Sequence, residues 1–377
     1  MKILYIANIR IPTEKAHGFQ IMKTGEEFTK QGQVVTLLVA KRFNSGALKR
    51  QNPFEYYGIK KQFPLKKLFC IDLIFGSMYK LIGPLAFWLQ SVTFIISLKL
   101  HLLKNKYDLI YCRDEPVLAA LLNHNNLVYE AHKAPGAKYK LMLSRVQKII
   151  CITNIIKKEI IKQGIASEKI LVAPDAVDLA EFSVKQSQRQ CRAELKLPVE
   201  KKLAIYTGHL FAWKGVYTLA DAAALLPENF LVIFVGGAPY DVNELKNYIK
   251  VNNIKNTKLI GHVKRKYIPP YLAAADIAVL PNSAKSKISK FYTSPLKMFE
   301  YLAARRPVVA SDLPSIREVL DESCAVLVPS DDPKILAEAI IKAATADNKK
   351  IINAAYQKVK NYTWEKRTEK ILKFISK

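Results

Sequence analysis

Short apolar runs alternate along the chain with longer segments in which apolar residues recur every three or four positions. In the first half these runs predict strands at residues 3–7, 34–39, 109–111, 127–130, 148–151 and 170–172. In the second half they predict strands at residues 203–207, 231–235, 259–260, 277–280, 308–310 and 326–328. Near-continuous apolar strands separated by helices are typical of parallel sheets that are covered on both faces. Because the pattern occurs twice, we expect an α/β protein with two such domains.

The domain boundaries follow from this repetition. We expect an N-terminal domain at residues 1–175, a polar linker at 176–200 and a C-terminal domain at 201–345. Helices at 346–377 should pack back toward the N-terminal domain. Ligands of parallel sheets bind at the carboxyl ends of the strands, so two facing sheets would form a cleft between the domains.

Residues 81–98 form an apolar run of eighteen residues, the length at which a transmembrane helix must be considered. Polar residues nevertheless recur through and beyond it at steps of three or four, on one face of a helix: Gln90, Thr93, Ser97, His101 and Lys104. We interpret the segment as an amphipathic helix. It either lies on a membrane or packs against its own domain, two alternatives that periodicity does not separate.

The charge of the chain is strongly positive, with 59 Lys and Arg against 32 Asp and Glu, a net +27. Such an excess favours an anionic partner, namely nucleic acid, a phosphorylated small molecule or a lipid surface. Between residues 41 and 106 there are twelve basic residues and two acids, Glu55 and Asp72, so this stretch is a basic insertion around the amphipathic run. Five scattered cysteines without a CxxC pair argue against a disulfide framework or a zinc site. The residues after Met1 do not have the pattern of a signal peptide, so we do not expect secretion.

Two loops that follow predicted strands could bind an anion. Residues 208–215 combine glycines, a helix start and Lys214, which suits a phosphate, although a turn with a solvated lysine has the same pattern. A second helix begins at 294–296, where backbone amides would face an anion, and Glu300 on it could accept hydrogen bonds from a vicinal diol such as a ribose. Taken alone, a glutamate in this position is more often an ordinary acid on a helix surface. The sequence contains no Walker, GxGxxG, GxSxG, HExxH or Asp-x-Asp motif, so we expect no metal at the site.

In their order along the chain, these segments resemble glycosyltransferase family 4. The resemblance rests on Gly208-His209-Leu210 through Lys214-Gly215, on Val235-Gly236-Gly237, on Gly261-His262-Val263, and on 275–281, 294–311, 331–333 and 362–364. In the first half, Ala16-His17-Gly18-Phe19-Gln20 and Tyr129-Glu130-Ala131-His132 fit the same family, so nearly the whole chain is covered. The resemblance implies a GT-B fold, in which two Rossmann-like domains face each other across a cleft.

The resemblance also implies the site residues, with a UDP- or GDP-linked sugar donor on the C-terminal domain and the acceptor on the N-terminal domain. The implied donor-binding residues are Gly18, Gly208, His209, Lys214, Gly237, His262, Val263, Tyr292, Ser294, Pro295, Leu296 and Glu300. The implied acceptor-binding residues are His17, Gln20 and His132, and the implied catalytic residues are His132, Lys214 and Glu300. The chain departs from the family pattern at Tyr292, where an acid is usual, and at His209, where an arginine is usual. We expect Tyr292 to shape the sugar pocket, with packing on Phe291 as the alternative.

The implied reaction is metal-independent hexosyl transfer from a nucleotide sugar with retention of anomeric configuration and no further cofactor. In the front-face mechanism commonly proposed for the family, the leaving phosphate takes the acceptor proton, so His132 would position the substrate and stabilise charge; a buried structural histidine is the alternative. The basic insertion predicts a cytoplasmic protein held peripherally on the anionic inner face of the cell membrane. The acceptor would then be a lipid-linked or cell-envelope glycan, as in lipopolysaccharide or capsule synthesis. Two alternatives stay open, a basic nucleic-acid-binding protein, for which no recognition motif is present, and a GT-B nucleotide-sugar epimerase.

Overall fold

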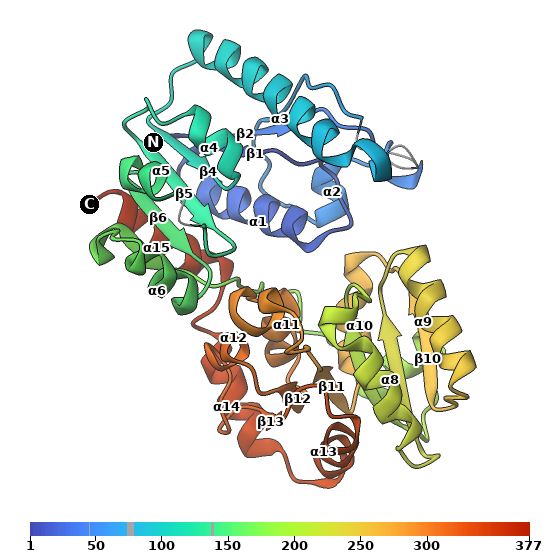
Figure 1. Ribbon diagram of the computed structural model, residues 1–377. Helices are drawn as coiled ribbons and strands as arrows, with labels where there is room; N and C mark the ends of the chain where they lie inside the picture. The colour runs from blue at the N-terminus through green and yellow to red at the C-terminus, as the bar shows by residue number, and fades with distance from the viewer. Residues whose placement is uncertain (45, 74–78, 137–138) are drawn as a thin grey trace. The chain divides into compact units, whose positions relative to one another are not determined.

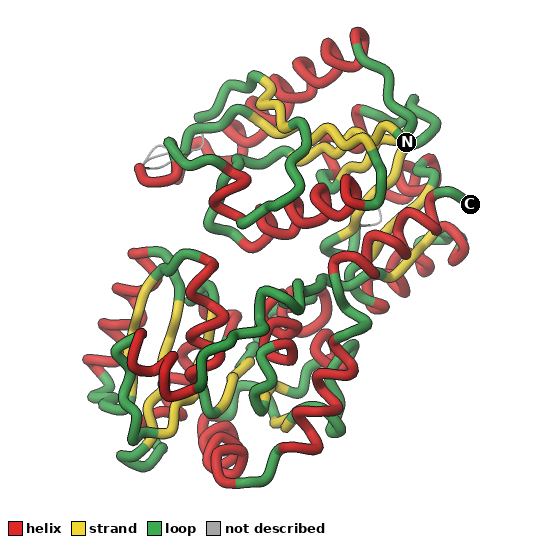
Figure 2. The backbone as a smooth tube through the Cα atoms, turned by 180° about the vertical axis from the view of Figure 1, so that it is seen from behind, coloured by secondary structure: helices red, strands yellow, loops and turns green. Residues whose placement is uncertain are grey.

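The computed structural model describes residues 1–44, 46–73, 79–136 and 139–377. Contacts divide the chain into two units, the first comprising Met1–Ala173 with Arg367–Lys377 and the second Pro174–Lys366. Each unit contains one parallel sheet with helices along it (Figures 1 and 2). The α/β architecture with two Rossmann-like domains that the sequence predicts is confirmed.

The sheet of unit 1 has seven parallel strands in the order β3-β2-β1-β4-β5-β6-β7. Their bounds are Lys2–Ala7 (β1), Val34–Ala40 (β2), Leu65–Leu68 (β3), Leu109–Cys112 (β4), Leu127–Ala131 (β5), Lys148–Cys151 (β6) and Ile170–Val172 (β7). Strand β3 is the one that the sequence pattern did not predict. It is an edge strand that carries Lys66 and Lys67 on exposed positions, so it lacks the apolar run of a central strand.

Helices cover the sheet of unit 1. They are Ala16–Lys30 (α1), Pro53–Tyr57 (α2), Tyr79–Lys104 (α3), Glu115–Ala120 (α4), Lys140–Arg145 (α5), Asn154–Lys162 (α6) and the C-terminal Trp364–Ile375 (α15), with single turns at Gly46–Leu48 and Ser167–Lys169. Most of α15 belongs to this unit although it lies at the other end of the sequence, beside β6 in Figure 1. Gln31 donates a hydrogen bond to Thr368 at 2.6 Å, and the Lys148 ammonium lies over the Phe374 ring.

Helix α3 contains the predicted amphipathic run and packs against β3 and α4. Its polar side faces the domain, because Gln90 and Ser91 are buried there, and its apolar side is exposed. The structure therefore places the polar stripe inward, the reverse of an ordinary surface helix. Residues 45 and 74–78 of the predicted basic insertion lie outside the described residues.

The sheet of unit 2 has six parallel strands in the order β10-β9-β8-β11-β12-β13. Their bounds are Lys202–Thr207 (β8), Phe230–Val235 (β9), Thr257–Gly261 (β10), Ile277–Leu280 (β11), Val308–Ser311 (β12) and Val326–Val328 (β13). Two apolar clusters are built on alternate residues of these strands, one containing Ile205 and Ile233 and the other Ala204 and Val232. Burial on both faces explains why the central strands read as continuous apolar runs, whereas the edge strand β10 is half-buried along its length.

Eight helices of unit 2 accompany these strands among the described residues. They are Gln188–Glu194 (α7), Val216–Ala224 (α8), Pro239–Val251 (α9), Ile268–Ala274 (α10), Leu296–Ala303 (α11), Pro314–Arg317 (α12), Pro333–Thr345 (α13) and Lys349–Val359 (α14), with single turns at Ala212–Lys214, Arg265–Tyr267 and Ile288–Tyr292. Residues 176–200, expected as a linker, instead contribute α7 to this unit, because the buried Arg192 bonds the Ala274 carbonyl and pairs with Asp276 at 2.6 Å. Helix α14 also packs here, against α11, so the segment 346–377 is divided between the two units.

Both sheets have a position where the chain reverses the direction in which strands are added. It lies between β1 and β4 in unit 1 and between β8 and β11 in unit 2. The loops that follow the two strands at such a position diverge, so a ligand can enter between them at the carboxyl ends. The predicted site residues follow these strands or their neighbours in both units.

Candidate functional site

The loop after β8 is shaped by close backbone approaches. Gly215 has a φ of +74°, and a Cβ there would lie 1.7 Å from the Pro281 carbonyl oxygen at the end of β11. A Cβ on Gly236, which follows β9, would lie 2.4 Å from the Gly208 carbonyl oxygen. Only glycine permits both contacts. They bring the loops after β8, β9 and β11 together at the carboxyl edge of the sheet.

Two lysines converge on this loop. The partly buried Lys214 has its ammonium 3.9 Å from the Trp213 ring centroid, and burial lowers its pKa to about 8, against the opposing effect of Asp175. Lys297 lies in the first turn of α11, and its ammonium is 3.4 Å from the Tyr206 ring centroid and 3.2 Å from where a Cβ on Gly208 would be. Burial first, and then the charge of Lys214, holds the pKa of Lys297 well below its usual range.

Lys297 is one of the residues of this site that sequence reasoning missed. Its ammonium is buried, and among the described residues it has no hydrogen-bond partner. Burying an unpaired cation is costly, and a second cation nearby raises the cost. An anion bound at the loop would relieve both penalties, so the arrangement suits a phosphate group. The signal in the sequence was its place in the first turn of a helix that starts at the predicted anion site.

Helix α11 positions the predicted phosphate-facing residues. The helix begins at Leu296 after Pro295, and this N-cap residue has no side chain that can cap the first turn. Ser294 accepts a hydrogen bond from the Asp175 amide at 3.0 Å, which ties the helix start to the segment after β7. Proline has no amide hydrogen, so Ser294 and Leu296 carry the N–H groups of the predicted 294–296 set.

Glu300 is buried one turn further along α11, where it is paired. Arg265 donates to Glu300 at 2.9 Å and binds Glu181 through two further contacts of 2.8 and 2.9 Å. The two carboxylates raise the pKa of the half-buried Arg265, although burial itself opposes this. Sequence reasoning did not identify Arg265 or Glu181. The predicted diol-binding carboxylate is therefore held in place by a guanidinium, with its Oε1 atom engaged.

The remaining donor-side residues lie at the same edge of the sheet. His209 stacks on Phe211 at 4.8 Å between ring centroids, and Phe211 stacks on Trp213 at 6.2 Å. His262 is exposed and Val263 is half-buried at the end of β10. Gly237 follows β9 with a φ of +87°.

Tyr292 ends the single π-type turn before α11. Its half-buried ring is tilted against Phe291, with 6.1 Å between the ring centroids. This contact agrees with the packing alternative. A role of the Tyr292 hydroxyl in sugar binding stays a prediction.

In unit 1, the predicted histidine belongs to a network around one buried carboxylate. Glu130 on β5 accepts hydrogen bonds from Gln20 at 2.5 Å, His132 at 2.7 Å and Arg367 at 3.0 Å, and also from the Tyr111 hydroxyl. Although burial opposes it, the charge of Arg367 and the hydrogen bond from His132 hold the pKa of Glu130 well below its usual range. The carboxylate is thus ionised and fully surrounded by donors.

The network fixes the state of His132. Burial, reinforced by Arg113, lowers its pKa to about 4, so the imidazole is neutral at pH 7. An ionised carboxylate only accepts hydrogen bonds, so Nε2 carries the proton and Nδ1 keeps a lone pair. A neutral imidazole of this tautomer can accept a hydrogen bond from a hydroxyl group. It cannot supply the positive charge that charge stabilisation would need.

The other predicted residues of unit 1 have mainly structural surroundings. Gln20 is buried, with its carboxamide oxygen bound by Arg113 and its nitrogen by Glu130. Gly18 lies under Tyr57, since a Cβ there would be 2.2 Å from the Tyr57 hydroxyl. His17 is half-buried on the first turn of α1. Gln20 and Gly18 therefore help to build the carboxyl edge of the sheet, and their roles in substrate binding stay predictions.

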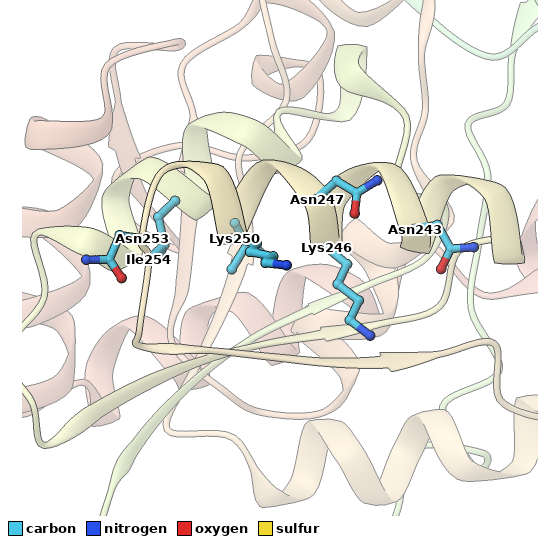
Figure 3. A pocket seen from close by; sticks show the side chains of 7 residues that line it. Asn243, Lys246, Asn247, Lys250, Asn253 and Ile254 are labelled. Carbon is cyan, nitrogen blue, oxygen red and sulfur yellow. The ribbon is translucent and has the colours of Figure 1, made fainter.

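A shallow hollow elsewhere on unit 2 contains none of these residues. It follows α9 and is lined by the side chains of Asn243, Lys246, Asn247, Ile249, Lys250, Asn253 and Ile254 (Figure 3). Asn243, Asn247 and the two lysines lie along the helix and Asn253 lies in the turn after it, with no carboxylate or aromatic ring among the lining residues. Among the residues that the structure describes, no three His, Cys, Asp or Glu side chains are grouped so as to hold a metal ion.

Comparison with known proteins identifies both halves of the chain. Residues 24–181 match the model of "Glycosyltransferase Family 4", and residues 201–346 match that of "Glycosyl transferases group 1". TuaC of Bacillus subtilis, provisionally assigned as a glycosyltransferase of teichuronic acid biosynthesis, is 22% identical over 91% of this chain and 89% of its own.

Two solved structures show the same fold. HepE of Anabaena in complex with UDP-glucose has a TM-score of 0.75 at 19% identity, covering 100% of this chain and 99% of its own. WaaG, a glycosyltransferase involved in lipopolysaccharide biosynthesis, has a TM-score of 0.69 at 16% identity, covering 99% of each chain.

Proposed function

Because the chain belongs to glycosyltransferase family 4 and has the GT-B fold, we propose that it transfers a hexosyl group from a nucleotide sugar to a cell-envelope glycan or its lipid-linked precursor. The assignments of TuaC to teichuronic acid biosynthesis and of WaaG to lipopolysaccharide biosynthesis support this class of acceptor. The UDP-glucose complex of HepE supports a UDP-linked sugar as the first donor to test, with GDP-linked sugars as the second.

The observation that carries the proposal is the pair of lysines at the carboxyl end of β8. Lys214 and Lys297 bring two ammonium groups to one loop, and the buried Lys297 has no hydrogen-bond partner among the described residues. A diphosphate carries the negative charge that would pair with these two cationic groups. The family usually has an arginine at position 209, and we propose that Lys297 supplies the second cation in its place.

The proposed reaction follows from this charge. The bond between the anomeric carbon and the phosphate oxygen breaks, and the negative charge that develops on the diphosphate is stabilised by Lys214, Lys297 and the first-turn amides of α11. The acceptor hydroxyl oxygen forms the new bond to the same face of that carbon. Its proton passes to the leaving phosphate, so the configuration is retained and no enzymic base is required. The two lysines provide the charge that a metal ion would otherwise provide.

The other residues have positioning roles in this proposal. Glu300 accepts hydrogen bonds from the ribose diol through its second oxygen, while Arg265 holds the first. Neutral His132, oriented by Glu130, accepts a hydrogen bond from a sugar or acceptor hydroxyl through Nδ1. Tyr292 contacts the donor sugar through its hydroxyl. The Tyr292→Phe and Tyr292→Ala variants should then lose transfer activity while UDP affinity is kept.

Calorimetry with UDP, GDP and their glucose, galactose and N-acetylglucosamine conjugates tests the donor. We expect one nucleoside diphosphate to bind to the wild type and its sugar conjugate to be hydrolysed slowly without acceptor. Proton NMR of the product formed with a membrane glycan extract then gives the anomeric configuration. The absence of binding by every nucleoside diphosphate would refute the proposal. A product of inverted configuration would refute retention. Release of an epimerised nucleotide sugar without transfer would indicate an epimerase.

A further inference from the structure

Helix α3 exposes an apolar face to solvent. Its exposed residues are 49–83% accessible and occur at steps of three or four, which places them on one side of the helix: Leu85, Trp88, Val92, Ile96, Leu100 and Leu103. We refer to these six residues as the apolar stripe. The helix lies at the periphery of its unit, as Figure 1 shows. Contiguous exposed apolar surface of this extent marks an interaction site.

The opposite face of α3 is fixed to the domain by polar contacts. Gln90 donates to the Asn8 side chain at 2.7 Å, and Asn8 donates to Ser91 at 3.2 Å. Phe94 and Leu98 are buried on the same side. Residues Gly83–Lys104 are long and apolar enough to cross a membrane by length and composition alone. Crossing would break these contacts and expose Gln90 to lipid, so the geometry favours a helix that lies along a surface.

The surroundings of the apolar stripe are basic. The exposed Lys99 lies on the same side of the helix as the apolar stripe. The exposed Lys66 and Lys67 lie on β3, and the exposed Lys104 lies at the end of the helix. Strand β3 packs against α3, which brings its lysines close to the helix. Burial first, and then the charge of Lys66, lowers the pKa of His101 on α3. Asp72, one of the two acids between residues 41 and 106, is buried and paired with Arg42.

We propose that the apolar stripe of α3 and the lysines around it form a docking surface for an anionic lipid bilayer. The apolar side chains and Trp88 would enter the interface, and the lysines would reach the head groups. A second copy of the chain fits less well, because a symmetric interface would bring these lysines against their equivalents. A nucleic acid would engage the lysines but leave the aliphatic stripe in water. The proposal places the protein peripherally on the inner membrane face, and it does not depend on the identity of the donor.

Vesicle flotation of the full chain tests the proposal, with Ile96→Glu as the stripe variant. Val251→Glu is the matched control, since Val251 is an exposed aliphatic residue on α9 of the other unit. We expect the wild type and Val251→Glu to float with vesicles of phosphatidylcholine and phosphatidylglycerol, less so at high salt. Ile96→Glu should reduce the bound fraction about tenfold, because a carboxylate must enter the interface. UDP affinity should be equal in all three proteins, which separates this test from that of the proposed function.

Several results would overturn the proposal. Equal flotation of the wild type and Ile96→Glu, or no flotation of either, would exclude the stripe as a lipid surface. Sedimentation that shows a dimer converted to a monomer by Ile96→Glu would identify a second copy as the occupant. A gel shift with mixed RNA or DNA that is lost in Lys66→Glu/Lys67→Glu and kept in Ile96→Glu would identify a nucleic acid instead.

Discussion

Two clusters of charged groups, one around Glu130 in unit 1 and one around Lys297 in unit 2, are organised in opposite ways. In unit 1, Glu130 is surrounded by donors from four different segments of the chain, and its pairing with Arg367 is complete without a ligand. In unit 2, Lys214 and Lys297 lie together, and the buried Lys297 has no hydrogen-bond partner among the described residues. A network that is already satisfied fixes side chains, whereas an unsatisfied one favours a ligand of the missing charge. The contrast supports the proposed positioning role for the groups around Glu130 and the proposed anion binding by Lys214 and Lys297.

The largest effect should come from breaking the satisfied network. Glu130→Gln leaves the buried Arg367 without its carboxylate, and loss of one partner of a buried ion pair costs about 3–5 kcal/mol. The free energy of unfolding, measured by urea titration, should fall by that amount. Glu159→Gln removes an exposed partner of Lys162 on α6 and should leave it unchanged within error. Equal stability of Glu130→Gln and the wild type would mean that the network is not formed.

In contrast to Glu130→Gln, Lys297→Met should raise the stability of the protein, and it should strongly weaken UDP binding. Removing a buried unpaired amine while keeping the apolar stem should raise the thermal midpoint. Loss of a charged contact to diphosphate costs about 1.5–3 kcal/mol, roughly ten- to hundredfold in UDP affinity. Calorimetry and thermal melts of the same sample measure both. Lys246→Met, at an exposed position on α9, should change neither quantity. A lower midpoint together with unchanged affinity would show that Lys297 is structural.

Comparing two acids that share one arginine can isolate the role of Glu300. Glu300→Gln and Glu181→Gln each remove one carboxylate from Arg265, but only Glu300 is proposed to bind the ribose. We expect Glu300→Gln to weaken UDP binding about tenfold or more and Glu181→Gln to have a smaller effect. A 2′,3′-dideoxy analogue of UDP, which lacks the ribose diol, should bind the wild type and Glu300→Gln with equal affinity. Equal losses in the two variants would assign the effect to Arg265.

The smallest effect is on the pH dependence of diphosphate binding. The free Lys214 has a pKa of about 8, and a bound anion raises that pKa. Below pH 8 the lysine is protonated with or without ligand. Above pH 8 binding must take up a proton, so UDP affinity should fall by up to about tenfold per pH unit. Lys214→Arg stays charged and should flatten this fall. Calorimetry in two buffers of different ionisation enthalpy at pH 8.5 measures the proton uptake, and no uptake would contradict the lowered pKa.

Local sequence patterns were sufficient to predict most of the fold. Twelve strands were visible because the central ones are buried on both faces and read as apolar runs, and the edge strands β7, β10 and β13 still contain short apolar runs. The loop 208–215 was visible because glycines at close approaches and a lysine at a helix start are local features. Strand β3 was not visible, since an edge strand with Lys66 and Lys67 exposed has no such run. Residues 176–200 read as a linker because Arg192 looks like a surface residue until Asp276 is placed beside it.

The sequence by itself determined the order of the elements, the α/β class and the loops that carry Lys214 and Glu300, because these depend on residues that are neighbours in the chain. Only the tertiary structure decided which charges meet. It put Lys297 beside Lys214, Arg265 between Glu300 and Glu181, and Arg367 against Glu130, across separations of 35 to 237 residues for the hydrogen-bonded pairs. It also turned the polar side of α3 inward, because Gln90 finds Asn8 there. The periodicity of apolar and polar residues shows that a helix has two different faces. Only packing against the rest of the domain determines which face is exposed to solvent.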